Sequence, residues 1–340
     1  MSEASELNDY KKVFDKNGSI KELRVLKWIH FENSVKSPLT CISREANGNI
    51  VAIYATMPVI TKINGDTRVA CQSLDTLTDS NHRGKGLFIK LAQKVYDKAK
   101  SQNVAFVYGF PNGKSIHGFS NKLEWEDLDQ VTFLIKPLKT GYFTNRLKFL
   151  EFLPSFNLSF GSYTESEKYR VVMSNSFPIQ VDEIWQNFSK KIKVAVDRNK
   201  EYLDWRFINK PNENYKIVQC YDKADDFIGF IVYCVKNKHK GRIAYIMEFI
   251  YDLNHPKSGK QLLDYAVQEI KKEKAELILT WCFEHSPNYK ALKNNYFFKM
   301  PEKLRPIELH FGARAFDDNL KEIIAKRENW YLSYSDSDTV

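Results

Sequence analysis

The segment with the clearest chemical potential is residues 79–88, which read Asp-Ser-Asn-His-Arg-Gly-Lys-Gly-Leu-Phe. Glycines at 84 and 86 allow the backbone to turn tightly and to approach a ligand closely. An amphipathic helix is expected to begin at this point, so its unpaired amides and the positive end of its dipole would face the loop. Arg83 and Lys85 add positive charge. The pattern predicts a cradle for a diphosphate group.

The loop is distinct from the two best-known phosphate-binding motifs. It lacks the Gly-x-x-x-x-Gly-Lys-Ser/Thr of nucleoside triphosphatases and the Gly-x-Gly-x-x-Gly of dinucleotide-binding folds. A short glycine loop alone is equally consistent with a simple turn between a strand and a helix. The neighbouring elements therefore carry the argument further.

The residues around the loop alternate between strand and helix patterns. Strands are expected at 40–44, 50–57 and 67–78, with turns at Asn-Gly and Asn-Gly-Asp sequences between them. After the loop, Phe88, Leu91, Ala92 and Val95 share one helical face. A short apolar strand at 104–110, a helix near 115–122 and a strand near 130–135 follow. Upstream, residues 19–36 have helical spacing, with Ser19 and Glu22 as an expected capping box.

The second half of the chain repeats this order at an offset of 173 residues. Asp79, Asn81, His82 and Gly86 correspond to Asp252, Asn254, His255 and Gly259, and the strand at 104–110 corresponds to 277–283. Similarity at a fixed offset is how duplicated units appear in a sequence. The second loop has a single glycine, and Pro256 replaces Arg83, which removes an amide donor. We therefore expect a phosphate cradle in the first half alone.

Length and composition agree with two globular units. The chain has 340 residues, or roughly two domains at about 150 residues each. Hydrophobic residues make up 43% and charged residues 27%, which excludes wholesale disorder. There is no apolar run long enough for a spanning helix, and the polar N-terminus does not resemble a secretory signal. The five cysteines form no Cys-x-x-Cys pair, so we expect a reduced, cytoplasmic protein without a metal site.

The net charge of +9 is compatible with an anionic partner, which could be nucleic acid, an acidic membrane or a phosphorylated small molecule. Lys and Arg form no block of five or six, which argues against nucleic acid. Residues 137–165 contain many aromatic and aliphatic residues. A membrane-surface helix is one interpretation, but an apolar stripe more often packs on a core, so an interdomain segment is favoured. The expected division is 1–138, a bridging segment 139–165, and 166–340.

The loop and its surroundings resemble the GNAT superfamily of N-acetyltransferases. The family motif Arg/Gln-x-x-Gly-x-Gly/Ala reads here Arg83-x-x-Gly86-x-Phe88, with Phe88 in place of a small residue. The strand at 104–110, Asn112-x-x-Ser115 and the sequence Lys-Leu-Glu-Trp at 122–125 resemble the next family segment. The resemblance covers about residues 40–136. With the duplication, it implies an α/β fold of two tandem GNAT-like domains, each a mixed, mostly antiparallel sheet flanked by helices, like members associated with bacterial surface-polysaccharide genes.

The resemblance implies roles for individual residues. Acetyl-CoA would be the co-substrate, and no metal is expected. Backbone groups of Thr76, Leu77 and Thr78 would pair with the pantetheine arm, and an amide beside Leu77 would stabilise the oxyanion. Asn112 and Ser115 would lie on the pantetheine side. The diphosphate would be held by the loop residues Arg83, Gly84, Lys85, Gly86, Leu87 and Phe88.

Direct attack by an amine requires a base, because the amine must be neutral. Asp75, at the end of the strand that enters the loop, is the leading candidate, with Glu248 as its repeat equivalent; alternatively it accepts hydrogen bonds from loop amides. His117 is a second candidate, although a packing or solvent-facing histidine is the simpler interpretation. The family often protonates the leaving thiolate with a tyrosine. The matching helix has none, which leaves Ser120, Tyr108 or water.

The leading hypothesis is an acetyl-CoA-dependent N-acetyltransferase that acts on a small amine. A nucleotide-linked amino sugar is suggested as acceptor by family analogy alone, and the second half would wall off the acceptor site. One alternative is a peptidoglycan-type transferase that uses aminoacyl-tRNA. Another is a non-catalytic CoA-binding protein. The sequences Tyr-Leu-Asp-Trp-Arg at 202–206 and Ser-Asp-Ser-Asp at 335–338 also resemble that tandem group, without an assigned chemistry.

Overall fold

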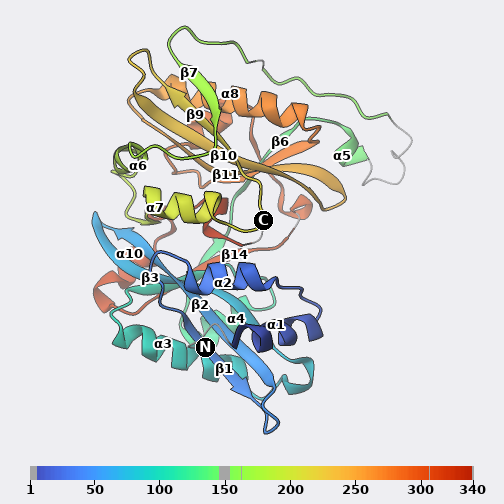
Figure 1. Ribbon diagram of the computed structural model, residues 1–340, viewed down its shortest axis with the longest axis vertical. Helices are drawn as coiled ribbons and strands as arrows, with labels where there is room; N and C mark the ends of the chain where they lie inside the picture. Colours follow the sequence, from blue (N-terminus) through green and yellow to red (C-terminus); the bar gives the residue numbers. More distant parts are fainter. Residues whose placement is uncertain (1–5, 145–153, 162, 306, 339–340) are drawn as a thin grey trace.

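The computed structural model describes residues 6–144, 154–161, 163–305 and 307–338. Two mixed β-sheets of seven strands each, with helices against them, form the two halves of the molecule (Figure 1). The α/β fold class with two such sheets is therefore confirmed. The described C-terminal residues lie between the halves in this view, whereas the N-terminus lies on the lower half.

The first sheet contains the strands that flank the glycine loop. Its order is β1 (Leu39–Arg44), β2 (Ile50–Ile63), β3 (Asp66–Thr78), β4 (Phe106–Gly109), β14 (His310–Ala315) and β5 (Glu126–Gln130), and β8 (Val194–Val196) pairs with the end of β2. The β3–β4 pair is parallel, and the other pairs are antiparallel. The helices of this half are α1 (Leu7–Lys16), α2 (Leu23–Phe31), α3 (Leu87–Ser101) and α4 (Ile116–Leu123).

The second sheet has the same plan. Its order is β13 (Phe298–Lys299), β6 (Phe133–Pro137), β12 (Leu277–Trp281), β11 (Gly241–Tyr251), β10 (Phe227–Lys238), β9 (Lys216–Tyr221) and β7 (Arg170–Ser174). The accompanying helices are α5 (Gly141–Thr144), α6 (Val181–Phe188), α7 (Lys200–Leu203), α8 (Pro256–Lys272), α9 (Tyr289–Asn294) and α10 (Lys321–Ile324). A π-helical turn (Asp204–Ile208) follows α7, and short 3-10 turns span Ser80–His82, Glu302–Leu304, Asp318–Leu320, Arg327–Asn329 and Tyr334–Asp336.

The element order of the first half recurs in the second at the spacing read from the sequence. The series β10, β11, α8, β12 and α9 follows the series β2, β3, α3, β4 and α4, and β11 pairs with β12 in parallel as β3 does with β4. Both β3 and β11 carry a bulge near the same point, at Asp75 in the first and beside Glu248 in the second.

Each sheet contains a strand that comes from the other half of the sequence. β14, from near the end of the chain, lies between β4 and β5 of the first sheet, and β6 lies between β12 and β13 of the second. The strand expected near 130–135 in the N-terminal domain is in fact split into β5 and β6, and β6 belongs to the other sheet. A division at residue 138 therefore does not separate the sheets, because strand pairing across the chain is invisible to periodicity.

The N-terminal helices also differ from expectation. The helix expected from Ser19 begins at Leu23, and Glu22 is an extended N-cap residue without a side-chain cap. The expected capping box is therefore wrong, and the Glu22 carboxylate instead accepts a hydrogen bond from Asn212 of the second half. α1 was not expected from the sequence at all; its Tyr10 and Phe14 are buried against the first sheet.

The bridging segment is described only in part. Residues 145–153, which include most of the apolar stripe at Leu147, Phe149, Leu150, Phe152 and Leu153, lie outside the described residues. Of the part that is described, α5 places Tyr142 in the buried core. Among the described helices, none has the length and apolar character needed to cross a membrane.

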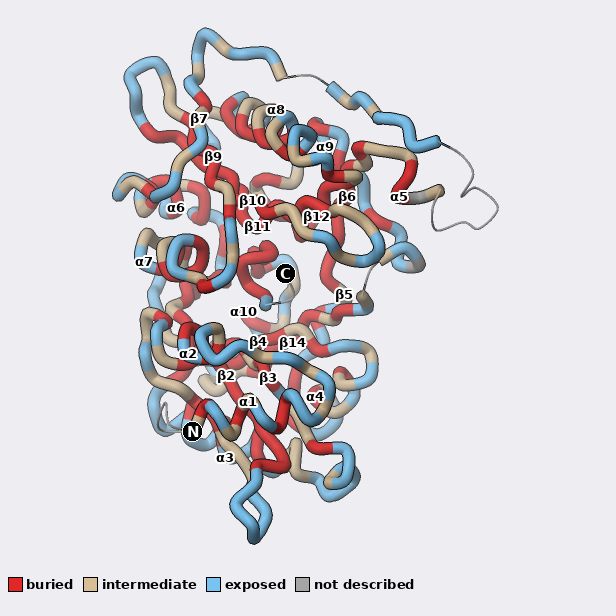
Figure 2. The backbone as a smooth tube through the Cα atoms, turned by 45° about the vertical axis from the view of Figure 1, so that its right-hand side comes forward, coloured by how far each residue is buried: buried red, intermediate tan, exposed pale blue. Residues whose placement is uncertain are grey.

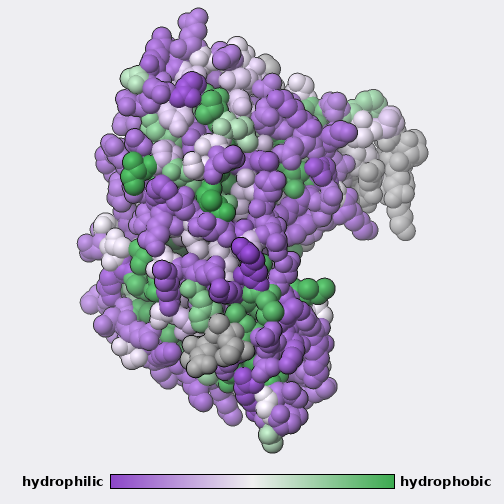
Figure 3. All heavy atoms as spheres, in the orientation of Figure 1, coloured by the Kyte–Doolittle hydropathy of each residue, from purple (hydrophilic) through white to green (hydrophobic). Residues whose placement is uncertain are grey.

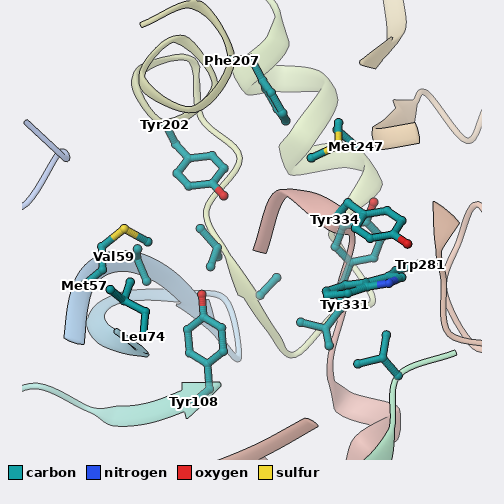
Figure 4. Close-up of a cluster of buried hydrophobic side chains, with 14 of the residues drawn as sticks. Met57, Val59, Leu74, Tyr108, Tyr202, Phe207, Met247, Trp281, Tyr331 and Tyr334 are labelled. Atoms are coloured by element: carbon teal, nitrogen blue, oxygen red, sulfur yellow. The ribbon is translucent and has the colours of Figure 1, made fainter. Parts of the chain in front are cut away.

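One hydrophobic core runs through both halves (Figure 2). The indole rings of Trp28 on α2 and Trp205 beyond α7 stack with centroids 4.3 Å apart, and each indole N–H donates to the other residue's carbonyl oxygen. Figure 4 shows Leu74 and Tyr108 of the first sheet in one buried cluster with Tyr202 and Tyr334. The halves are therefore held together by apolar burial, the main favourable term in folding.

Candidate functional site

The largest cleft lies where β3 and β4 separate. Their parallel pairing ends at Ser73 and Gly109, after which β3 continues and the chain beyond β4 turns away. The cleft has a volume of about 680 Å³. Its lining residues come from the end of β3, the glycine loop, the segment after β4 and the C-terminus: Gln72, Ser73, Leu74, Asp75, Thr76, Thr78, Arg83, Phe88, Phe110, Pro111, Asn112, Lys114, Ser115, Gly118, Phe119, Ser337 and Asp338.

The glycine loop lies at the edge of this cleft: Arg83 and Phe88 line it, whereas Gly84, Lys85, Gly86 and Leu87 lie outside its lining. Gly84 and Gly86 have φ values of +79° and +69°, and a side chain added at either position would meet no atom within 4 Å. Gly86 is the N-cap of α3 and supplies no side-chain cap. The first amides of a fifteen-residue helix therefore face open space, with the exposed Arg83 and Lys85 beside them. This geometry suits a diphosphate.

The beginning of the loop is held in place by Asp79. Its buried carboxylate accepts from the amide of Asn81 at 3.0 Å and from the ammonium of Lys16 at 2.7 Å. The Lys16 contact, followed by the Asn81 amide, lowers the pKa of Asp79 from its usual range. Asp79, to which the sequence pattern assigned no role, therefore connects the glycine loop with α1.

Phe88 explains how this loop departs from the family motif. Its ring lies 5.1 Å from that of Phe119 and 5.9 Å from that of Tyr54. A methyl group added at Gly118 would lie 3.2 Å from Phe88, so the glycine on α4 leaves the space that the large ring occupies. The bulky residue is therefore compensated on the facing helix.

The bulge in β3 sets the geometry of the acyl end of the cleft. Ile53 pairs with Leu77 and Ala55 with Leu74, so two residues of β3 lie opposite one residue of β2. Asp75 adopts φ +46°, a conformation that is costly outside glycine. A bulge interrupts the ladder and redirects backbone groups. Thr76 and Thr78, which follow the bulge, line the cleft, whereas Leu77 lies outside its lining.

Asp75 is an anchored carboxylate. It accepts from Tyr10 Oη at 3.1 Å and from Lys21 Nζ at 2.6 Å, and His30 Nε2 lies 3.6 Å away. Burial opposes ionisation, but His30 and Lys21 prevail and lower the pKa of Asp75 to about 2. A carboxylate with so low a pKa is a weak base near neutral pH. Asp75 lines the cleft, and its geometry favours a positioning role.

The other predicted site residues fall into two groups. Asn112 and Ser115 line the cleft, and Asn112 Oδ1 accepts from the Ser115 amide at 3.0 Å, which shapes the loop after β4. His117 is exposed and does not line the cleft. Ser120 and Tyr108 also lie outside its lining, and Tyr108 is buried among aromatic rings. The structure therefore does not bring these three residues to the cleft.

A second pocket of about 290 Å³ adjoins the cleft. The two share Gln72, Leu74, Ser337 and Asp338. Its remaining lining comes from both halves of the molecule: Lys21, Glu22, Val25, Trp28, Ile29, Met57, Trp205, Arg206, Lys210, Pro211, Asn212, Glu213, Lys236, Lys238 and Ser335. Figure 3 shows that most of this side of the molecule is hydrophilic, with hydrophobic residues in scattered patches.

The C-terminal segment Ser333–Asp338 lies between the halves and forms the shared wall. Arg206 donates to the carbonyl oxygens of Ser335 and Ser337 at 3.0 and 2.8 Å, and Tyr202 Oη donates to Ser335 at 3.0 Å. The buried Arg198 bonds Asp336 and Glu248. The two sequence motifs without assigned chemistry, at 202–206 and 335–338, are therefore partners that hold the wall in place.

The second half has no comparable open loop among its described residues. Gly259 packs so closely on the Tyr251 ring that an added side chain would lie 2.8 Å from it, and Pro256 begins α8. Glu248, the counterpart of Asp75, accepts from Tyr331, Ser333 and Ser335. The position equivalent to the cleft is thus filled by the chain's own C-terminal residues.

The described residues include no group of His, Cys, Asp and Glu side chains that could hold a metal ion. The cleft combines the first amides of α3, the bulged strand β3 and an adjoining second pocket. These parts lie on an α/β fold of two mixed sheets.

Comparison with known proteins agrees with this class. Residues 8–126 match the model of the acetyltransferase (GNAT) domain. No curated protein matches the sequence. The domain and the fold together support an acyltransferase enzyme.

Several solved structures share the fold across nearly the whole chain at low identity. A probable N-acyltransferase of unknown function from Enterococcus faecalis aligns with 12% identity over 93% of this chain and 71% of that one, with a TM-score of 0.60. Saccharomyces cerevisiae N-myristoyltransferase with bound myristoyl-CoA aligns with 11% identity over 92% and 76%, with a TM-score of 0.59. The same yeast enzyme with myristoyl-CoA and inhibitors gives a TM-score of 0.62 at 12% identity, over 92% and 78%.

Sequence reasoning missed residues that the tertiary fold brings to the site. Lys21 comes from the segment before α2, Trp28 from α2, and Lys210 and Lys236 from the second half. The sequence Ser-Asp-Ser-Asp at 335–338 was noted as a motif, but no periodicity connects Asp338 to Asp75. Only the packing of the halves does so.

Proposed function

We propose that the protein is an acetyl-CoA-dependent N-acetyltransferase that acts on a small amine. One observation carries the proposal: an open glycine loop at the beginning of α3 leads along a bulged strand to a second pocket. The cofactor would lie in the cleft with its diphosphate at residues 83–88 and its pantetheine arm along Thr76–Thr78. The amine would enter from the second pocket.

In this mechanism the neutral amine attacks the thioester carbon, and its electron pair forms the new C–N bond. A backbone amide beside Leu77 stabilises the oxyanion that develops on the carbonyl oxygen. Collapse of the intermediate breaks the C–S bond, and the sulfur leaves as thiolate. The amine loses a proton to a base, and the thiolate takes up a proton, so that an amide and free CoA result.

The base is assigned to Asp338, with Asp75 as the alternative. Asp338 lines both cavities, and its side chain retains 45% exposure, so that it can exchange a proton with water. Asp75 is 2% exposed at its side chain and is paired with Lys21, which lowers its pKa. Of the two carboxylates, Asp338 is the more exposed and the less tightly paired, which favours it as the base.

A short acyl group fits the floor of the cleft. Ser73 lines the cleft, and the Ser73 hydroxyl donates a hydrogen bond to Tyr54 Oη at 3.0 Å. Tyr54 and Tyr96 hydroxyls lie 2.7 Å apart, and Trp125 donates to Tyr96 at 2.9 Å. This buried polar chain occupies the space behind Ser73, which supports a short acyl group such as acetyl as the donor group.

A nucleotide-linked amino sugar, as in surface-polysaccharide synthesis, is the acceptor suggested by family analogy. The second pocket, at about 290 Å³, lies near the lower end of the range for small-molecule sites. It would accommodate a sugar-sized group, and a nucleotide would have to extend beyond it.

The test combines cofactor binding with turnover. Acetyl-CoA should raise the melting temperature of the wild-type protein, and a panel of amines should then be screened for release of free CoA thiol. Gly86→Val should abolish the thermal shift, because its side chain would occupy the open cradle at a φ of +69°. Gly48→Val is the matched control, since Gly48 also has positive φ (+86°) in an open turn but lies in the β1–β2 connection.

Each outcome has a definite meaning. If Gly86→Val and Gly48→Val bind acetyl-CoA equally well, the proposed cofactor site is wrong. A thermal shift without thiol release from any amine would instead indicate a non-catalytic CoA-binding protein.

A further inference from the structure

We propose that the second pocket selects an acceptor that carries an anionic group, a phosphate or a carboxylate, in addition to its amine. The anion would be bound by Lys210, Lys236 and Lys238. This inference rests on the proposed function, because it names the acceptor class of the same site.

The first observation is the balance of charge on the pocket wall contributed by the second half. Arg206, Lys210, Lys236 and Lys238 all line the pocket there. Glu213 is the carboxylate among them, 2.6 Å from Lys236 Nζ and 3.8 Å from Lys210 Nζ. Arg206 is satisfied by neutral oxygens, namely two carbonyls and the Tyr215 hydroxyl. The whole pocket is lined by five cationic side chains, namely Lys21, Arg206, Lys210, Lys236 and Lys238, and by three carboxylates, namely Glu22, Glu213 and Asp338.

The second observation is that these cations repel one another in a partly buried environment. The side chain of Lys210 is only 8% exposed. Burial, reinforced by repulsion from Arg206, lowers the pKa of Lys210 to about 7. The pKa of Lys238 is also lowered, by burial and by Lys236. The pocket lining thus carries more cationic than anionic side chains, and clustered groups with shifted pKa values in a pocket are a recognised mark of ligand sites.

The third observation is the direction of the pocket. Gln72, Leu74, Ser337 and Asp338 form the edge shared with the acyl end of the cleft, whereas the three lysines belong to the second pocket only. The indoles of Trp28 and Trp205 form an apolar part of the second pocket's lining. An acceptor would therefore place its amine at the shared edge near Asp338 and its anion at the lysines, with a carbon skeleton along the indoles.

A purely structural role for these lysines is the competing explanation. Lys210 Nζ lies over the rings of Trp28 and Tyr215, at 5.7 and 5.5 Å from their centroids. On the same rim, Glu22 bonds Asn212, so not every charge there is positive. A structural role predicts that removing a lysine alters stability and leaves acceptor preference unchanged, which provides the test.

The experiment uses matched amines with the full-length protein. Ethanolamine, phosphoethanolamine and β-alanine present a hydroxyl, a phosphate and a carboxylate, and glucosamine and glucosamine 6-phosphate form a sugar pair. KM is measured by thiol release at saturating acetyl-CoA. We expect KM to be at least about tenfold lower for an anionic member of a series than for its neutral counterpart. The phosphate and carboxylate arms identify which anion is preferred.

Variants assign the effect to the lysines. Lys238→Met, a half-buried position on β10, and Lys210→Met should each remove most of the anion preference while acetyl-CoA still binds. Lys94→Met, on the exposed face of α3, should retain it. If KM does not favour the anionic amines, or if Lys238→Met preserves the preference, the inference is overturned.

A binding measurement separates this inference from the proposed function. Calorimetric titration of glucosamine 6-phosphate and of inorganic phosphate into CoA-saturated protein should show binding that Lys238→Met weakens by about tenfold. Absence of such binding in a protein that acetylates neutral amines would refute the anion site alone. Failure to bind acetyl-CoA would refute the proposed function.

Discussion

Lys21 Nζ donates to Asp75 Oδ1 at 2.6 Å, inside the wall that separates the cofactor cleft from the second pocket. The same ammonium lies 4.0 Å from the carboxylate of Asp338. One lysine from the segment before α2 therefore connects a carboxylate of β3 with one at the C-terminus, at the point where the proposed donor and acceptor meet.

Replacement of Asp75 by Asn should destabilise the protein by about 3 kcal/mol, because Lys21 would lose its buried partner. The pKa of Asp75 is lowered to about 2, so its stabilising contribution is complete above the unfolded value of 3.8 and is lost as pH falls through 2. Urea unfolding at pH 7 and at pH 3 measures both effects. An unfolding free energy that matches wild type at pH 7 would contradict the anchoring role.

Replacement of Asp338 by Asn should lower kcat by about 10²-fold without changing the thermal shift by acetyl-CoA, since a base acts in the transition state. Asp66→Asn, in the exposed β2–β3 turn, serves as the control. Wild-type turnover in Asp338→Asn would transfer the base assignment to Asp75 or water.

Replacement of Arg206 by Met should release the C-terminal wall, because its guanidinium holds two carbonyls of that segment. We expect faster carboxypeptidase digestion and a loss of kcat/KM of roughly 10²-fold from misplacement of Asp338. Arg170→Met, whose guanidinium makes an exposed pair with Asp225, is the control. Unchanged digestion would show that the segment holds its place without Arg206.

Replacement of Lys210 by Met should stabilise the protein while it weakens the acceptor site. The pKa of Lys210 falls from 10.5 to about 7 on folding, so the unfolded chain binds one more proton between these values. Wild-type stability should therefore rise with pH from about 7 to 10.5, and the variant should lack this rise. Thermal unfolding from pH 6 to 10 compares the slopes. Parallel curves would contradict the assigned pKa shift.

The local elements around the site could be predicted from the sequence because their signals are local. The glycine pair at 84 and 86, the helical face that begins at Phe88 and the strand at 104–110 all appear where expected. The recurrence at 173 residues relates Asp75, in the bulge of β3, to Glu248, which lies beside the bulge of β11.

The shared wall could not be predicted, because its residues are far apart in the sequence. Lys21, Arg206 and Asp338 meet through packing of the two halves, and each alone is an unremarkable charged residue. His117 was a second candidate base, with a packing or solvent-facing role as the simpler interpretation, and the helix presents it to solvent outside the cleft lining. The chemistry of a residue type does not predict the direction in which its side chain points.

The exchange of β6 and β14 also governs how the protein can be made. The first sheet contains strand pairs between β4 and residues 310–315, so it is incomplete until residue 315 has left the ribosome. Until then the N-terminal half has an unpaired strand edge, a condition that favours aggregation or chaperone binding. The cleft beside β3 gains its lining residues Ser337 and Asp338 later still. The proposed acyl transfer would therefore have to follow the synthesis of residue 338.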